Sequence, residues 1–198
     1  MAWADVVRTA ALAVGAGEQA PALSAYVLAF VRWNRQINLS GARTVDEVAE
    51  HVVDCLALVP HVGQGARVVD VGSGGGLPGI VLAAARPDLQ LTCVEPIHKK
   101  AAFLRQAARD LRLTAKVLTH RVEELARSYD VAVSRATFEL STWLELGAAL
   151  VVPGGMVIGM EGLEQAVLPP GAVRHPYSIR DRTRALVIRV VPAEPPPR

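Results

Sequence analysis

The chain has only two cysteines, Cys55 and Cys93, among its 198 residues. Cys55 falls in a helical pattern of apolar residues and Cys93 in a strand pattern, so we expect two buried thiols. This excludes a disulfide-rich secreted scaffold and agrees with a reducing cytosol. The five histidines form no HExxH and accompany no CxxC, so we expect no metal site.

Long apolar runs are missing as well. The first residues, "MAWADVVRTA", contain no basic leader, and glycines interrupt the apolar stretch after them, which excludes a signal core and a membrane span. We therefore expect a soluble, cytoplasmic protein with no membrane partner. Positive charge is scarce in residues 1–97, which hold six Lys or Arg against nine Asp or Glu. Residues 98–198 hold fifteen Lys or Arg against ten Asp or Glu. This basic half is compatible with a polyanionic partner, although a solvated charged surface is the commoner reason for such a charge.

What is present divides the chain into two patterns. Apolar residues recur at helical spacing over residues 2–14, 22–37 and 44–60, and Thr44 and Glu47 form a capping box at the start of the third helix. From Arg67 to Met160, short β-branched segments alternate with helices, which predicts a parallel sheet covered by helices. The segments "AVRHPYSI" and "TRALVIRVV", separated by "RDR", then predict an antiparallel hairpin.

These patterns predict one compact α/β domain in three parts. Residues 1–63 form a helical extension packed on the core, residues 64–191 form the core, and residues 192–198, "PAEPPPR", form a disordered tail.

The stretch "VVDVGSGGGLPGI", Val68 to Ile80, is the strongest functional signal. A strand followed by a glycine-rich turn and a helix start brings backbone N–H groups close to a ligand. Two patterns overlap in it: GxGxG from Gly72, Gly74 and Gly76, and GxGxxG from Gly74, Gly76 and Gly79, which alone would suggest a dinucleotide. Asp70, two residues before the first glycine, completes a start that resembles class I S-adenosylmethionine (SAM)-dependent methyltransferases. A pyrophosphate would use the N–H that Pro78 lacks, and no Gly-Lys-Ser/Thr follows, which excludes a P-loop.

Two acidic residues follow the next strands. Glu95 ends the second strand, where a carboxylate can accept hydrogen bonds from ribose hydroxyls, in NAD as well as in SAM. Glu123 lies in "RVEE" after the third strand, where methyltransferases of this class place an acidic residue beside adenine. Together with Asp70 and the glycine loop, these residues favour SAM as the cofactor.

The fourth strand ends in "SRAT", Ser134 to Thr137. This is neither the Asn/Asp-Pro-Pro-aromatic signature used on exocyclic amines nor a Pro-Cys pair for covalent attack on a pyrimidine. An acceptor atom with its own free lone pair would need neither signature.

The chain is similar to the bacterial 16S rRNA guanine-N7 methyltransferases called RsmG, formerly GidB. The similarity runs from Trp33 to Ala136. It rests on "WNRQINLSGAR", "HVVDCLAL", "VVDVGSGGGLPGIVLAAARPDLQLTCVE", "KKAAFLRQ", "RVEE" and "VSRA". The resemblance implies a class I methyltransferase fold with a seven-stranded sheet, and N7-methylation of a guanine in 16S rRNA or in a small-subunit particle. We expect a monomer.

The resemblance also implies site residues. SAM would be bound by Gly72, Leu77, Glu95, Val122, Glu123 and Arg135, beside the Asp70, Gly74 and Gly76 of the loop. Lys100, Arg121 and Arg184 are expected at the RNA. His51 and Asp54 match the family's pattern, but an internal hydrogen bond explains them equally well. The chain departs from the family at Glu161-Gly162, where Lys-Gly is usual, and in "SRATF", where "SRAFA" is common.

The chemistry of this reaction needs few residues. Guanine N7 carries an in-plane lone pair and no proton, so it attacks a sulfonium methyl without a general base, and catalysis reduces to positioning and electrostatics. Arg135 is the candidate catalytic residue, orienting the cofactor or the guanine. Trp33, Trp143 and Tyr177 are candidate stacking platforms, each more often a core residue. Two alternatives remain: an NAD(P)-dependent oxidoreductase, and a non-catalytic RNA-binding module on the same fold.

Overall fold

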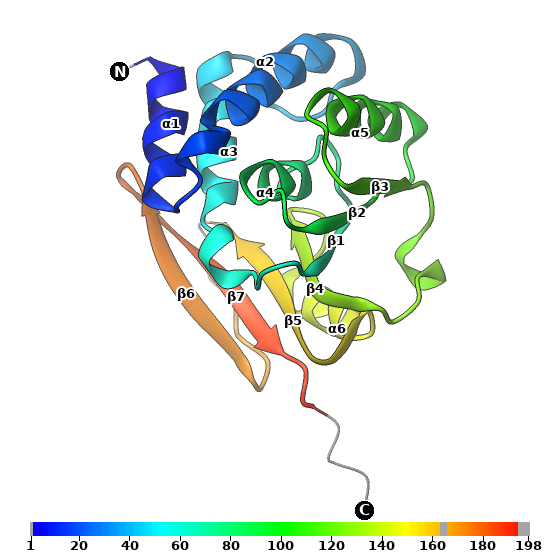
Figure 1. Cartoon of the computed structure of the whole chain (residues 1–198). Helices are drawn as coiled ribbons and strands as arrows, with labels where there is room; N and C mark the ends of the chain where they lie inside the picture. Colours follow the sequence, from blue (N-terminus) through cyan, green and yellow to red (C-terminus); the bar gives the residue numbers. More distant parts are fainter. Residues whose placement is uncertain (1, 163–165, 194–198) are drawn as a thin grey trace, which may run out of the picture.

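The β-branched segments of the sequence form a seven-stranded sheet with the strand order β3-β2-β1-β4-β5-β7-β6 (Figure 1). The structure is a computed structural model that describes residues 2–162 and 166–193. Strands β1 to β5 are parallel, and β7 pairs antiparallel with both β5 and β6. The strands are β1 (Arg67–Val71), β2 (Gln90–Val94), β3 (Ala115–Leu118), β4 (Tyr129–Arg135), β5 (Val151–Glu161), β6 (Ala172–Ile179) and β7 (Arg182–Val190). The expected parallel sheet with a C-terminal antiparallel hairpin is confirmed.

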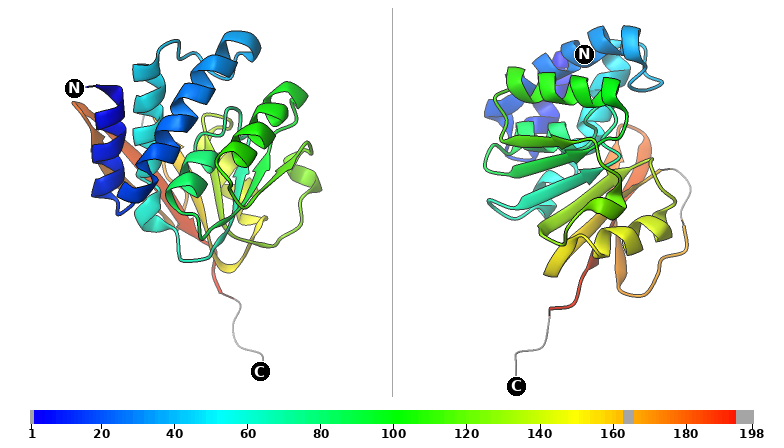
Figure 2. Two further views of the ribbon diagram at one scale, coloured as in Figure 1. Left: turned by 45° about the horizontal axis from the view of Figure 1, so that its top comes forward. Right: turned by 90° about the vertical axis from the view of Figure 1, so that its right-hand side faces the viewer.

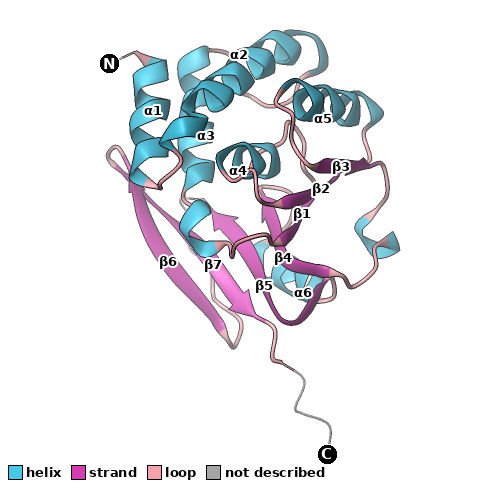
Figure 3. Cartoon of the chain, in the orientation of Figure 1, coloured by secondary structure: helices cyan, strands magenta, loops and turns pink. Residues whose placement is uncertain are grey.

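Helices cover both faces of the sheet, as Figures 2 and 3 show. Successive strand residues point to opposite faces, so Val68 packs in the cluster under α1 to α5, while Val69 packs with α6 on the other side. The α-helices are α1 (Trp3–Ala13), α2 (Ala20–Ile37), α3 (Val45–Leu56), α4 (Gly79–Ala85), α5 (His98–Asp110) and α6 (Leu140–Ala148). Short 3₁₀ turns are η1 (Gly17–Gln19), η2 (Val59–His61) and η3 (Val122–Glu124).

The first three helices share their core with the sheet layer. Phe30 of α2 meets Phe103 of α5 edge-on, with ring centroids 5.9 Å apart, and both side chains are fully buried. The capping box of α3 is confirmed: Glu47 N donates to Thr44 Oγ1 at 3.2 Å, and Thr44 N donates to the Glu47 carboxylate at 3.0 Å. The expected buried thiols, Cys55 and Cys93, are both fully buried. The start of α3 is therefore set by residues close together in the sequence, and one face of the helix packs in the core.

A few boundaries differ from the sequence expectation. α4 begins at Gly79, directly after Pro78, and the Gly79 N–H is donated to the Asp70 side chain. The hairpin turn is Arg180 and Asp181, one residue shorter than expected. The expected disordered tail reaches residues 194–198, which lie outside the described residues. Among the residues that are described, none of the helices combines the length and apolar character needed to cross a membrane.

Candidate active site

The glycine loop joins β1 to α4 at the carboxyl edge of the sheet. Gly72 has φ +72° and Gly74 has φ +55°, in the left-handed region that side chains with a Cβ rarely adopt. The loop is fixed to the neighbouring strand, because Gly72 N and Ser73 N both donate to Val94 O, at 2.9 and 3.1 Å. A Cβ on Gly74 would have open space around it, with Gly72 O the nearest atom at 3.8 Å. The loop therefore presents bare backbone.

The Asp70 side chain is hydrogen-bonded to the residue that follows this loop, Gly79. It is fully buried, its Oδ2 accepts the Gly79 N–H at 3.0 Å, and its Oδ1 has no partner among the described residues. Burial raises the pKa of Asp70 to about 7. Neither Asp70 nor Gly76 lines a cavity described below; a Cβ on Gly76 would meet Ile80 at 2.5 Å. Both residues thus help to shape the loop, and direct contact of either with the cofactor stays a prediction.

The glycine-loop cavity, of about 490 Å³, lies over this backbone. Glu95 is buried beneath it, with Oε2 accepting the Gly74 N–H and Oε1 accepting the Ile97 N–H, both at 2.8 Å. Each carboxylate oxygen keeps a second lone-pair direction for a ligand hydroxyl. Of the residues singled out in the sequence, those that line it are Gly72, Gly74, Leu77, Glu95, Lys100 and Arg135.

A smaller side cavity, of about 200 Å³, adjoins it. Val122, Glu123 and Arg121 line this cavity together with apolar residues of β1 and β2. Thr137 lines both cavities, and its Oγ1 lies 3.3 Å from Gly72 O. A Cβ on Gly72 would lie 2.3 Å from the Thr137 side chain. Sequence reasoning assigned no role to Thr137, which sits at the boundary between the two cavities.

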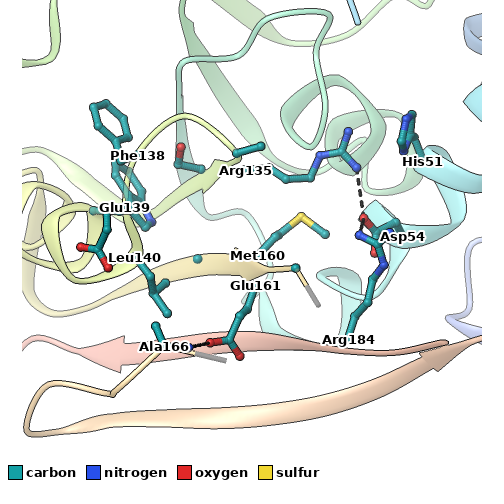
Figure 4. A pocket seen from close by; sticks show the side chains of 15 residues that line it. His51, Asp54, Arg135, Phe138, Glu139, Leu140, Met160, Glu161, Ala166 and Arg184 are labelled. Atoms are coloured by element: carbon teal, nitrogen blue, oxygen red, sulfur yellow. Dashed lines mark hydrogen bonds and ion pairs between the residues drawn. The ribbon is translucent and has the colours of Figure 1, made fainter. Parts of the chain in front are cut away.

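A third cavity, of about 510 Å³, opens on the other side of Arg135 (Figure 4). We call it the arginine cavity; it is lined by His51, Asp54, Ser134, Arg135, Ala136, Phe138, Glu139, Leu140, Trp143, Gly159, Met160, Glu161, Gly162, Ala166 and Arg184. Arg135 and Ala136 line the glycine-loop cavity as well. Ala136 has φ +54°, a strained value for a residue with a Cβ, at the point where the two cavities meet.

Asp54 is the centre of a charged cluster in the arginine cavity. Its Oδ2 accepts from Arg135 Nη1 at 3.1 Å and from Arg184 Nη1 at 3.3 Å, and its Oδ1 accepts from the Tyr177 hydroxyl at 2.7 Å. Its side chain is only 3% exposed. Burial lowers the pKa of the neighbouring His51, and the charge of Arg135 lowers it further.

The sequence identified Asp54 but could not give its partners. His51 and Asp54 are three residues apart on α3, which shows only that they share a face. Arg135, Tyr177 and Arg184 are 81, 123 and 130 residues further along the chain. Only the folded sheet edge brings them to this carboxylate.

Glu161, where the resembled family usually has lysine, is also buried in this region. Its carboxylate accepts from Arg174 Nε at 2.6 Å and Arg174 Nη2 at 2.9 Å, and from Ala166 N at 2.8 Å. These bonds from Arg174 hold the pKa of Glu161 below its usual range. The negative charge of Glu161 is therefore balanced by Arg174 of the β6–β7 hairpin.

The expected stacking platforms do not gather at one cavity. Trp143 borders the arginine cavity but is 2% exposed, and its Nε1 donates to Ile158 O at 3.0 Å. Trp33 packs against Phe103. The three predicted RNA contacts are also separated: Lys100 lies at the glycine-loop cavity, Arg121 at the side cavity and Arg184 at the arginine cavity.

Comparisons with known proteins agree on one family. The family model described as "rRNA small subunit methyltransferase G" matches residues 19–167. The ribosomal RNA small subunit methyltransferase G of Chromobacterium violaceum is 42% identical over 161 residues, covering 77% of this chain and 77% of that protein. The one from Burkholderia multivorans is 42% identical over 161 residues, covering 74% and 71%.

Solved structures show the same fold at low sequence identity. Cofactor-bound Rv0187 from MTB superposes with a TM-score of 0.62 at 19% identity, covering 88% of this chain and 91% of that one. Magnesium protoporphyrin IX methyltransferase from Synechocystis, with bound SAM, gives 0.56 at 17% identity, covering 81% and 89%. The fold is therefore that of the class I methyltransferases.

Proposed function

The chain belongs to the rRNA small subunit methyltransferase G family, and we propose that it transfers the methyl group of SAM to N7 of a guanine in 16S rRNA at the junction of the glycine-loop and arginine cavities. The observation that carries this proposal is that Arg135 and Ala136 line both cavities, so two bound molecules can meet there. SAM is the cofactor, and small-subunit rRNA, free or in its particle, is the substrate. We expect a cytoplasmic monomer.

The residues present fit SAM. Gly74 has left-handed backbone with open space where a Cβ would be, which leaves room for a ligand against the loop. Glu95 is buried under the same cavity and retains lone pairs for ribose hydroxyls. The side cavity, lined by Val71, Val94, Val122 and Phe138, offers apolar walls to a flat base, with Glu123 at its edge. The overlapping GxGxxG pattern does not indicate an NAD(P)-dependent oxidoreductase here, since the family is a methyltransferase family.

The chain's own residues act by positioning. Bound SAM supplies an electrophilic methyl group on a sulfonium. Guanine N7 attacks with its own lone pair, so no side chain has to remove a proton. Arg135, whose side chain is 16% exposed and held by Asp54, is positioned at the junction to orient the reacting groups.

The test is transfer of labelled methyl from SAM to small ribosomal subunits and to protein-free rRNA, followed by nuclease digestion and identification of the modified base. The expected product is N7-methylguanosine. Arg135→Ala is expected to reduce kcat at least about a hundredfold. The melting temperature of the apo protein should stay close to that of the wild type. Tight SAM binding with no transfer to either substrate, or a different methylated base, would overturn the proposal.

A further inference from the structure

The arginine cavity has the size and position of an acceptor site for the proposed function. Its volume of about 510 Å³ is within the range of small-molecule sites. It meets the glycine-loop cavity at Arg135 and Ala136. Its walls combine apolar side chains, among them Met160 and Phe138, with a small number of charged groups. Such a mixture is typical of a site that holds a flat base and reads one of its edges.

The charged groups are organised by one carboxylate. Arg135 and Arg184 converge on Asp54 from two different strands, as Figure 4 shows. Both donate to the same oxygen, so two guanidinium charges face a single negative charge. Within residues 2–162 and 166–193, neither guanidinium donates another hydrogen bond. A guanidinium carries five N–H donors, so most of those on Arg184 are available to a ligand in the cavity.

The chemistry of purines indicates what these donors read. N7 and position 6 lie on the same edge of a purine, so when N7 faces the methyl group, position 6 lies next to the junction. In guanine position 6 is the acceptor O6, and in adenine it is an amino donor. A guanidinium beside the junction therefore attracts guanine and repels adenine. Arg184 suits this task because it lines the arginine cavity without lining the glycine-loop cavity.

We propose that the arginine cavity is the acceptor-base site, that Arg184 donates to O6 of the target guanine, and that Asp54 is the positioning residue that holds Arg135 at the junction and Arg184 beside it in the arginine cavity. This rests on the proposed function and adds to it the group that selects the base. Tyr177, bonded to the other oxygen of Asp54, keeps the carboxylate turned toward both arginines.

The first experiment separates base reading from cofactor binding. Arg184→Met is expected to reduce kcat/KM on small ribosomal subunits at least about tenfold, with SAM affinity and melting temperature close to those of the wild type. The matched control is Arg189→Met, which removes another arginine of β7 that is paired with a carboxylate, that of Glu145, outside the cavity. Wild-type kcat/KM in Arg184→Met would overturn the proposal, and so would an equal loss in Arg189→Met.

The second experiment asks whether O6 is the group being read. Binding of guanosine 5′-monophosphate and of 2-aminopurine riboside 5′-monophosphate, which lacks O6, is measured by saturation-transfer NMR with S-adenosylhomocysteine present. The wild type and Arg189→Met should prefer the guanine nucleotide, and Arg184→Met should bind both alike. A uniform weakening would indicate a merely structural role for Arg184. No binding of the guanine nucleotide to the wild type at millimolar concentration would also overturn the proposal.

Asp54 is tested with two variants, because loss of a buried charge can unfold the chain. Asp54→Asn should abolish the preference for guanine, and Tyr177→Phe should reduce it while leaving both arginine pairs in place. If both variants fold and both keep the wild-type preference for the guanine nucleotide, Asp54 is removed from the proposal. If Asp54→Asn does not fold, the preference measured in Tyr177→Phe decides alone. Wild-type methyl transfer in the same preparation tests the proposed function itself: transfer without these effects defeats only this inference, whereas no transfer defeats the proposed function.

Discussion

At the scale of single residues, Gly72 shows how closely the loop is packed. Its φ of +72° strains any residue with a Cβ, and that Cβ would lie 2.3 Å from the Thr137 side chain. A larger residue at position 72 would therefore collide with the Thr137 side chain and also reduce the space left for SAM. We expect Gly72→Ala to weaken SAM binding about tenfold or more, measured by calorimetric titration, and to lower the melting temperature.

Gly171 provides a matched control for this prediction. It also has a positive φ, +80°, but nothing lies within 4 Å of a Cβ built there. Gly171→Ala should therefore lower the melting temperature through backbone strain alone and leave SAM binding unchanged. If Gly72→Ala binds SAM as well as Gly171→Ala does, the close packing of Gly72 against Thr137 has no consequence for the cofactor.

Asp70 predicts a dependence of stability on pH. Its pKa is raised to about 7 by burial, above the ordinary value of 3.8, so between about pH 4 and 7 the folded chain holds a proton that the unfolded chain has lost. The stabilising contribution is complete below pH 4, falls as pH rises to about 7, and is absent above that. We expect Asp70→Asn to remove this part of the slope and to raise the free energy of unfolding at pH 8 by about 1 kcal/mol or more, in urea titrations across this range.

Asp88 is the opposite case and serves as the control. The hydrogen bonds from Arg86 hold its pKa below the usual range, so its contribution is present above pH 4 and is lost only in acid. Asp88→Asn should leave the slope between pH 4 and 7 as it is in the wild type. A wild-type slope in Asp70→Asn would assign the dependence to other groups.

At the scale of elements, the Glu161–Arg174 pair joins the end of β5 to β6. The Glu161 side chain is 4% exposed, and two nitrogens of Arg174 donate to it. Glu161→Lys would place two positive charges together at a site with little water, so we expect the melting temperature to fall by about 5 °C or more. The charge-reversed double variant Glu161→Lys with Arg174→Glu should recover part of this loss. No recovery in thermal melts would mean that packing, and not charge, dominates at this position.

The elements differ in how much of them is encoded locally. Thr44 and Glu47 predicted the start of α3 correctly because a capping box needs only residues three apart. The alternation of apolar segments likewise predicted the sheet and its closing hairpin. The partners of Asp54 could not be predicted, because its ion pairs join residues 81 and 130 positions apart and depend on how β4 ends and β7 begins beside α3. The place of Thr137 over Gly72 depends in the same way on tertiary packing.

At the scale of the whole molecule, the N-terminal helices support the glycine loop. The Tyr26 hydroxyl donates to Gly75 O at 2.5 Å, and a Cβ on Gly75 would lie 2.3 Å from the Phe30 ring. Trp33 of the same helix packs against Phe103 of α5. These residues belong to the hydrophobic cluster that also contains β1 and β2 side chains. The helical layer and the glycine loop are therefore coupled through shared contacts.

This coupling predicts a single cooperative unfolding transition. A chain that keeps only Trp33, through Trp3→Phe and Trp143→Phe, reports on the helical layer, and one that keeps only Trp143, through Trp3→Phe and Trp33→Phe, reports on α6 at the opposite face. In each, the fluorescence midpoint in urea should coincide with the midpoint from circular dichroism. Trp33 does not line the glycine-loop cavity, where we propose that SAM binds. SAM should nevertheless raise both fluorescence midpoints together, because a ligand of the folded state stabilises the whole cooperative unit. An earlier Trp33 midpoint that SAM does not move would make the N-terminal helices a separate folding unit.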